Sequence, residues 1–159
     1  EELVTLPCYE WQHMLVMPLD HPLAKQENIS LEDLALQPLI TYHPSFTGRT
    51  KVDLAFAAKR LQPRIALEAI DSDVIKTYVR LGLGVGIVAE MALRDDGTNA
   101  DLVALPAGHL FGMNVARVAF KRSAYLRNFV YKFAELLNDK LDRAQITRAM
   151  SSRHNDYEL

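Results

Sequence analysis

Short apolar runs alternate with segments of helical spacing through the middle of the chain, and this order restricts the fold more than any other feature. Residues 39–42, 64–69 and 85–89 have the length and composition of strands, and the segments between them repeat apolar residues at helical spacing. The last of the three runs is wholly apolar, as expected of a strand buried on both faces. Strands that alternate with helices predict a parallel α/β sheet.

The sequence on either side of this region predicts further strands and a helix. Residues 3–18 are rich in β-branched, aromatic and aliphatic side chains, which predicts two short strands or one long bent strand. Residues 102–105 predict a short edge strand, and residues 113–120 predict another strand. An apolar stripe over residues 125–137 predicts a long final helix. Beyond about residue 141 the sequence is polar, and we expect a mobile tail.

Composition and charge exclude several classes of protein. Of the 159 residues, 49% are hydrophobic and 24% are charged, which is typical of a globular domain. Because 18 basic residues face 20 acidic ones, no overall positive field exists to hold nucleic acid or an anionic membrane. No apolar run approaches the roughly 18 residues of a membrane span. The sequence therefore predicts a folded protein that binds neither DNA nor a membrane directly.

The single cysteine and the first residues bear on the protein's context. Cys8 has no partner for an internal disulfide, so nothing requires an oxidising compartment and the cytoplasm is the default expectation. Its apolar neighbours favour a buried, inert thiol over a redox sensor. The sequence starts at Glu1 directly before a strand-like segment, so we expect a piece of a longer protein.

Motifs of catalysis and of metal or nucleotide binding are absent from the sequence. The five histidines are scattered and Cys8 stands alone, so no set of residues has the spacing of a zinc site. There is no GxSxG motif and no P-loop. The glycines of residues 82–86 follow a predicted helix and enter a strand, the reverse of the order that binds a dinucleotide. We therefore expect a protein that is not an enzyme and has no metal or cofactor.

The loop over residues 41–50 has the features of an anion-binding site. It leaves the carboxyl end of a predicted parallel strand and enters a helix, whose free N–H groups and dipole favour an anion. Ser45 and Thr47 offer hydroxyl donors, Gly48 allows close approach of the backbone, and Arg49 adds positive charge. An equally open interpretation is that Thr47 only caps the helix that it precedes.

Other candidates have a structural interpretation that is stronger than a functional one. Residues 71–73 read Asp-Ser-Asp before a helix, and their two carboxylates would repel an anion, so they are expected to cap that helix. Tyr9, Trp11 and Phe46 could line a pocket, but aromatic residues in strands usually belong to a core.

Several segments together resemble the CysB branch of the LysR-type transcriptional regulators. They are the motif FTGR at residues 46–49, the run DVIKTYVRLGLGVG at residues 73–86, LPCYxW at residues 6–11 and DHPL at residues 20–23. The first two are specific to this branch, whereas HPL and GLGVG occur across the superfamily. The resemblance covers residues 1–142.

The resemblance implies an α/β effector-binding domain of two Rossmann-like lobes, similar to a periplasmic binding protein. Residues 1–15 would form a crossing strand of the first lobe, and residues 16–105 would form the second lobe. Residues 106–142 would return to the first lobe as a strand and a C-terminal helix, and residues 143–159 would be a polar tail. A DNA-binding helix-turn-helix domain and the rest of the first lobe would lie outside this chain.

The resemblance also implies a function in regulating sulfur assimilation and cysteine biosynthesis. The full-length regulator would be a homo-oligomer that binds DNA through its N-terminal domain. Its effector would be a small anion or acid, sulfate or acetylserine, held between the lobes by hydroxyls and backbone amides. The expected ligand-binding residues are Thr47 of the FTGR motif, Thr41, Ser45, Phe46 and Gly48 of the same loop, and Tyr9 and Trp11 of the crossing strand.

The rival hypothesis is a stand-alone solute-binding protein or a small-molecule enzyme with the same lobes. A solute-binding protein would carry an export signal, and an enzyme would need an assembled acid–base or nucleophile set. The 159 residues contain neither, which favours the regulator.

Overall fold

The computed structural model describes residues 2–93 and 97–151. Contacts divide the chain into two compact units, which are described one at a time: residues 11–114 form the larger unit, and residues 1–10 with 115–159 form the smaller one. Two strands, β1 (Leu3–Pro18) and β6 (Met113–Lys121), contribute residues to both units.

The larger unit is built on a mixed sheet with the strand order β3-β2-β4-β1-β5. Strand β2 (Pro38–Tyr42) runs parallel to β3 (Arg64–Ala69) and to β4 (Val85–Ala89), which confirms the predicted parallel α/β arrangement. Strand β1 pairs antiparallel with β4 and with β5 (Leu102–Pro106). The predicted edge position of β5 is also confirmed.

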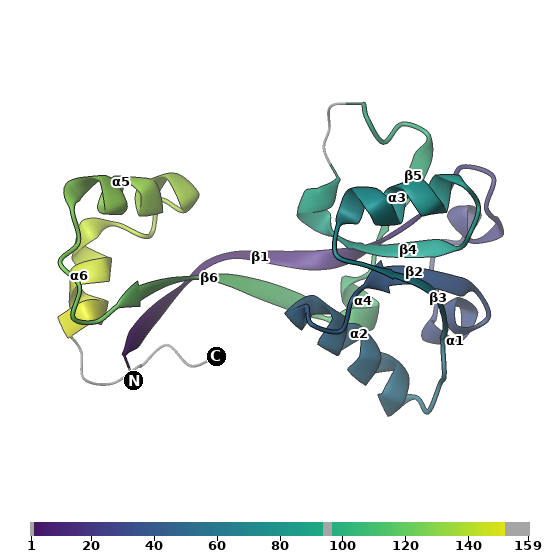
Figure 1. The fold of residues 1–159 in the computed structure, drawn as a ribbon, viewed down its shortest axis with the longest axis horizontal. Helices are drawn as coiled ribbons and strands as arrows, with labels where there is room; N and C mark the ends of the chain where they lie inside the picture. The colour runs from purple at the N-terminus through teal and green to yellow at the C-terminus, as the bar shows by residue number, and fades with distance from the viewer. Residues whose placement is uncertain (1, 94–96, 152–159) are drawn as a thin grey trace. The chain divides into compact units, whose positions relative to one another are not determined.

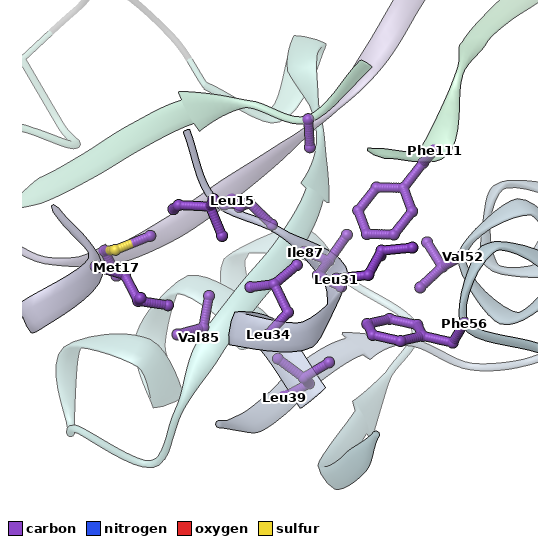
Figure 2. Packing of buried hydrophobic residues seen from close by; sticks show 13 residues of the cluster. Leu15, Met17, Leu31, Leu34, Leu39, Val52, Phe56, Val85, Ile87 and Phe111 are labelled. Atoms are coloured by element: carbon purple, nitrogen blue, oxygen red, sulfur yellow. The ribbon is translucent and has the colours of Figure 1, made fainter. Parts of the chain in front are cut away.

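Helices cover both faces of this sheet (Figure 1). On one face lie α1 (Leu31–Ala35), α2 (Thr47–Ala58) and α4 (Gly108–Phe111). Figure 2 shows the core that they form with the sheet, which includes Leu15, Leu39, Val52, Phe56 and Phe111. Helix α3 (Ser72–Arg80) packs on the opposite face, and short 3-10 turns follow β1 at Pro22–Lys25 and β4 at Glu90–Ala92.

Local sequence signals account for the limits of α3 and for its fit on the sheet. The Asp71 side chain accepts a hydrogen bond from the Asp73 amide at 2.6 Å, as predicted for this capping segment. The helix ends before Gly82, whose φ of 75° is a conformation that glycine adopts without strain. In β4, a Cβ on Gly86 would lie 2.5 Å from the Val16 side chain and 2.8 Å from that of Val79. The glycine therefore lets the helix lie close to the sheet.

In the smaller unit, the first part of β1 pairs with β6, and two helices follow, α5 (Asn128–Leu137) and α6 (Arg143–Ser151). Residues from both strands and both helices share one core, and Cys8 is buried in it as expected. The core consists of Val4, Leu6, Cys8, Phe120, Ala134, Leu141, Ile146 and Ala149.

Three expectations about the end of the chain need correction. The predicted tail over residues 143–159 contains helix α6 up to Ser151, because Ile146 and Ala149 are buried against the two strands; residues 152–159 lie outside the described part. The helix expected over residues 125–137 begins only at Asn128, and it is not the last one. Of its apolar stripe, Phe129 and Phe133 are 67% and 61% exposed, while Ala134 is buried.

The expected lobe limits also differ from the observed units. The lobe limits expected at residues 15/16 and 105/106 stay a prediction, and the contacts divide the chain at 10/11 and 114/115. Both observed limits fall inside a strand, β1 or β6, and each strand continues unbroken across its limit. We describe β1 as one 16-residue strand, which decides between the two alternatives for residues 3–18.

Candidate functional site

Helix α2 begins at the carboxyl edge of the parallel strands of the larger unit. Strand β2 ends at Tyr42 and strand β4 ends at Ala89, and β1 brings His13 opposite Ala89. Side chains two positions apart in a strand share a face, so Thr41 and His13 lie on the same face as Leu39 and Leu15, the face that α2 covers. This edge of an open α/β sheet is where small ligands usually bind.

The turn that connects β2 to α2 is held by its own hydrogen bonds. The His43 amide donates to the Ala69 carbonyl at 3.0 Å, and the Phe46 amide donates to the His43 carbonyl at 3.0 Å. The Ser45 amide donates to Nδ1 of His43 at 3.2 Å, and the Ser45 hydroxyl lies 3.0 Å from the same nitrogen. The Ser45 hydroxyl, predicted as a ligand donor, thus has a partner within the turn.

The first turn of α2 presents free donors. Phe46 is the N-cap residue and makes no side-chain capping bond, so Thr47 is the first helical residue and the capping interpretation of Thr47 does not hold. Among the described residues, no group accepts a hydrogen bond from the amides of Thr47 and Gly48 or from the exposed Thr47 hydroxyl. The Arg49 amide donates to the Phe46 carbonyl at 3.0 Å. Two amides and one hydroxyl are therefore available at a helix end that favours anions.

The Arg49 side chain does not add its charge to this helix end. It is 7% exposed, and its Nη1 donates to the Tyr42 carbonyl at 2.7 Å and to Glu68 at 2.8 Å, while its Nε donates to Asp53 at 2.8 Å. Burial by itself disfavours the charged form, but the two carboxylates outweigh it, so the pKa of Arg49 is raised. Through these bonds Arg49 links α2 to the ends of β2 and β3. The expectation that Arg49 contributes positive charge to the loop was therefore wrong.

Two aromatic rings lie directly beneath Gly48. A Cβ on Gly48 would come within 3.2 Å of Nε2 of His13 and 3.3 Å of the Trp11 ring. The two rings are 5.2 Å apart, and His13 also meets Phe111 edge-on at 5.6 Å. Glycine at position 48 thus lets the first turn of α2 rest on Trp11 and His13.

Two buried polar side chains near this helix end lack hydrogen-bond partners. Thr41 is fully buried, and no described group bonds to its Oγ1. His13 is 1% exposed, and neither of its ring nitrogens has a partner among the described residues. Burial lowers the pKa of His13 and Lys51 lowers it further, while the nearby backbone of Gly48 opposes them. The ring is therefore neutral at neutral pH.

His13 was missed by the sequence analysis, although a signal for it existed. It follows Trp11 by two positions in a predicted strand, so the two side chains must share a face. A histidine between a glutamine and a methionine is unremarkable in isolation. Its position under α2 depends on packing that the sequence does not specify.

The predicted site residues are partly brought together. Trp11, Thr41, Phe46, Thr47 and Gly48 all belong to the larger unit and lie around the start of α2, where the Phe46 ring packs 5.6 Å from that of Tyr42. Tyr9 belongs to the smaller unit. There it is 48% exposed and lines a cavity of about 330 Å³ with Pro7, Cys8, Glu10, Val115, Asn138, Lys140 and Gln145.

The part of the chain that the structure describes offers neither a metal site nor a membrane-spanning helix. No cluster of three or more His, Cys, Asp or Glu side chains could hold a metal ion there. None of the described helices is long and apolar enough to cross a membrane.

Comparison with known proteins identifies the family. Residues 1–142 match the model of the LysR substrate binding domain. The chain belongs to this family. As a LysR-type domain, it is 52% identical over its whole length of 159 residues to the HTH-type transcriptional regulator CysB of Burkholderia cenocepacia, of which it covers 50%. It is 43% identical over 161 aligned residues to the HTH-type transcriptional regulator Cbl of Escherichia coli, covering 99% of this chain and 51% of that protein.

A solved structure supports the same assignment of this LysR-type domain. The cofactor-binding domain of the Cbl transcriptional regulator superposes with a TM-score of 0.86 at 45% identity, over 95% of this chain and 66% of that one. The expected α/β effector-domain fold and the CysB branch are thereby confirmed. The chain spans about half the length of the two regulators that it matches.

Proposed function

We propose that the chain is the effector-sensing part of a transcriptional regulator of sulfur assimilation and cysteine biosynthesis. Its effector is sulfate or acetylserine, and the chain acts by binding rather than by catalysis. The full-length regulator is a cytoplasmic homo-oligomer that contacts DNA through a domain outside residues 1–159. The similarity to proteins named CysB, Cbl and SsuR supports the regulatory part of this proposal.

One observation carries the proposal of an anionic effector: the first turn of α2 is uncapped. The amides of Thr47 and Gly48 have no acceptor among residues 2–93 and 97–151, and the Thr47 hydroxyl is exposed beside them. A helix N-terminus with free amides stabilises a negative charge through hydrogen bonds and through the helix dipole. An oxygen of sulfate or of the acetylserine carboxylate accepts these bonds.

The donors in this turn also favour an anion that carries no proton. The free groups are two amides, which only donate, and one hydroxyl, which can donate or accept. Sulfate and a carboxylate are acceptors throughout at neutral pH, whereas hydrogen phosphate carries an O–H that needs an acceptor of its own. We therefore expect sulfate to bind better than phosphate.

Calorimetric titration of the full-length protein tests the proposal. Thr47→Ala removes one hydrogen bond to a charged acceptor, worth roughly 1.5–3 kcal/mol, so the affinity for the effector should fall roughly 10- to 150-fold. Thr47→Ser keeps the hydroxyl and should lose much less. Thr77→Ala makes the same change on α3, where the hydroxyl donates to the Asp73 carbonyl at 2.7 Å, and should leave affinity unchanged.

The titration contradicts the proposal in two cases. The first is that neither sulfate nor acetylserine binds to the wild-type protein. The second is that Thr47→Ala binds as tightly as wild type and only lowers the melting temperature, which would give Thr47 a structural role alone.

A further inference from the structure

We propose that His13 is a ligand-binding residue of the site at α2, and that its ring N–H group donates a hydrogen bond to the acidic group of the effector. This inference rests on the proposed function, because it adds a donor to the same site. It concerns a residue of β1 that precedes the FTGR loop by more than thirty positions.

The buried ring of His13 lacks well-formed hydrogen bonds. His13 is 1% exposed, and neither Nδ1 nor Nε2 has a hydrogen-bond partner among the described residues. A neutral imidazole has one donor and one acceptor nitrogen, and leaving a buried donor unsatisfied is costly. Most buried polar groups in folded proteins have a partner, so an unpaired one beside an anion site indicates that the partner is the ligand.

The ring of His13 lies next to the first turn of α2. The Cα–Cβ bonds of an α-helix tilt toward its N-terminus, so the space that a Gly48 side chain would occupy lies on the side where the free amides point. Nε2 of His13 is 3.2 Å from that Cβ position. Because Gly48 has no side chain, the ring can lie against the first turn of α2, which carries the free amides.

The polar contacts of the ring are with helix α2: the Gly48 backbone lies near enough to raise the pKa of His13, but neither ring nitrogen forms a hydrogen bond of good geometry with a described group. Trp11 and Phe111 contact it through their rings, and the charged group that affects it is Lys51 of α2, a cation. Nζ of Lys51 donates to the Met113 carbonyl. No described carboxylate acts on His13, so an anion bound at α2 would be the acceptor for its N–H group.

A pair of substitutions in the full-length regulator tests this donor, with sulfate and acetylserine as the titrants. His13→Leu keeps an apolar side chain in the core and removes both ring nitrogens, and we expect it to weaken effector binding by about 10- to 100-fold. His13→Gln keeps an N–H donor and should recover most of that loss, which a purely structural role would not produce. His109→Leu is the matched control: that ring lies 3.1 Å from the Ile29 carbonyl and should not affect affinity.

A second measurement on the wild-type protein keeps the test independent of folding of the variants. With ¹⁵N-labelled histidine, the chemical shifts of the His13 ring nitrogens should change as sulfate is added. When the site is saturated with sulfate, the ring should adopt a single tautomer, the one whose N–H donates to the anion. An unchanged His13 signal at saturating sulfate, or a His13→Leu variant that binds sulfate as tightly as wild type, would overturn the inference.

These outcomes also separate the inference from the function on which it rests. If the wild-type protein binds neither sulfate nor acetylserine, the proposed function fails. If the wild-type protein binds, and Thr47→Ala weakens binding while His13→Leu does not, only the role of His13 fails.

Discussion

Replacing Arg49 with methionine should destabilise the larger unit without removing the effector site. Arg49→Met keeps most of the length of the buried side chain but loses three hydrogen bonds, to Tyr42, Asp53 and Glu68. The bond from the charged guanidinium to the Tyr42 carbonyl is worth about 1.5–3 kcal/mol. The carboxylates of Asp53 and Glu68 are 48% and 36% exposed, so each ion pair adds only about 0.2–1 kcal/mol.

The free energy of unfolding should therefore fall by about 2–5 kcal/mol, a large part of the stability of a typical domain. Urea unfolding followed through Trp11 fluorescence measures this change, because Trp11 is the single tryptophan of the chain and lies beneath α2. Asp53→Asn removes only the charge of a half-exposed partner and should cost less than about 1 kcal/mol.

The two variants also separate a structural from a ligand-binding role for Arg49. Where Arg49→Met is still folded, the full-length protein should bind sulfate with nearly wild-type affinity. A loss of stability below about 1 kcal/mol together with a large loss of sulfate affinity would refute the reasoning, since the guanidinium would then contact the effector.

Three further outcomes are expected. Gly86→Ala places a methyl group 2.5 Å from the Val16 side chain, so thermal unfolding should show a loss of about 1–3 kcal/mol; an unchanged melting temperature would contradict this packing. Because folding lowers the pKa of His13, the unfolded chain binds more protons than the folded chain below about pH 6.5. As the pH is lowered through this range, the free energy of unfolding should fall more steeply in the wild type than in His13→Leu, by up to about 1.4 kcal/mol per pH unit. Equal slopes in the two proteins would mean that folding does not lower the pKa of His13. The exposed rings of Phe129 and Phe133 on α5 should make the 159-residue chain bind a hydrophobic dye or self-associate, and sedimentation as a dye-free monomer would contradict this.

Elements set by neighbouring residues were predictable from the sequence. The cap at Asp71 and the end of α3 before Gly82 follow from the local preferences of these residues. The parallel order of β2, β3 and β4 follows from alternation with helices. The start of α2 and the free donors of its first turn were also predictable, because a strand, a polar loop and a helix follow one another in the sequence.

Features that depend on distant residues were not predictable. Four of the nine residues of α6 are apolar, and whether they are buried depends on the core that Ile146 shares with Val4 and Leu6. The sequence offers Arg49 as a free charge, since its partner Glu68 is nineteen positions away. The same holds for His13, whose neighbour Gly48 is brought to it by the sheet.

The pairing of Arg49 with two carboxylates, which together outweigh its single positive charge, has a consequence for the speed and selectivity of capture. With Asp53 and Glu68 paired to the guanidinium, the attraction at the start of α2 comes from oriented N–H groups, whose field fades within the first turn of the helix. Such a field acts well inside the Debye length of about 8 Å at physiological ionic strength, and it does not steer anions from a distance. Both the association rate and the affinity should thus vary little with added salt. The fraction of such a domain that is occupied should then depend on the effector concentration and little on the ionic strength.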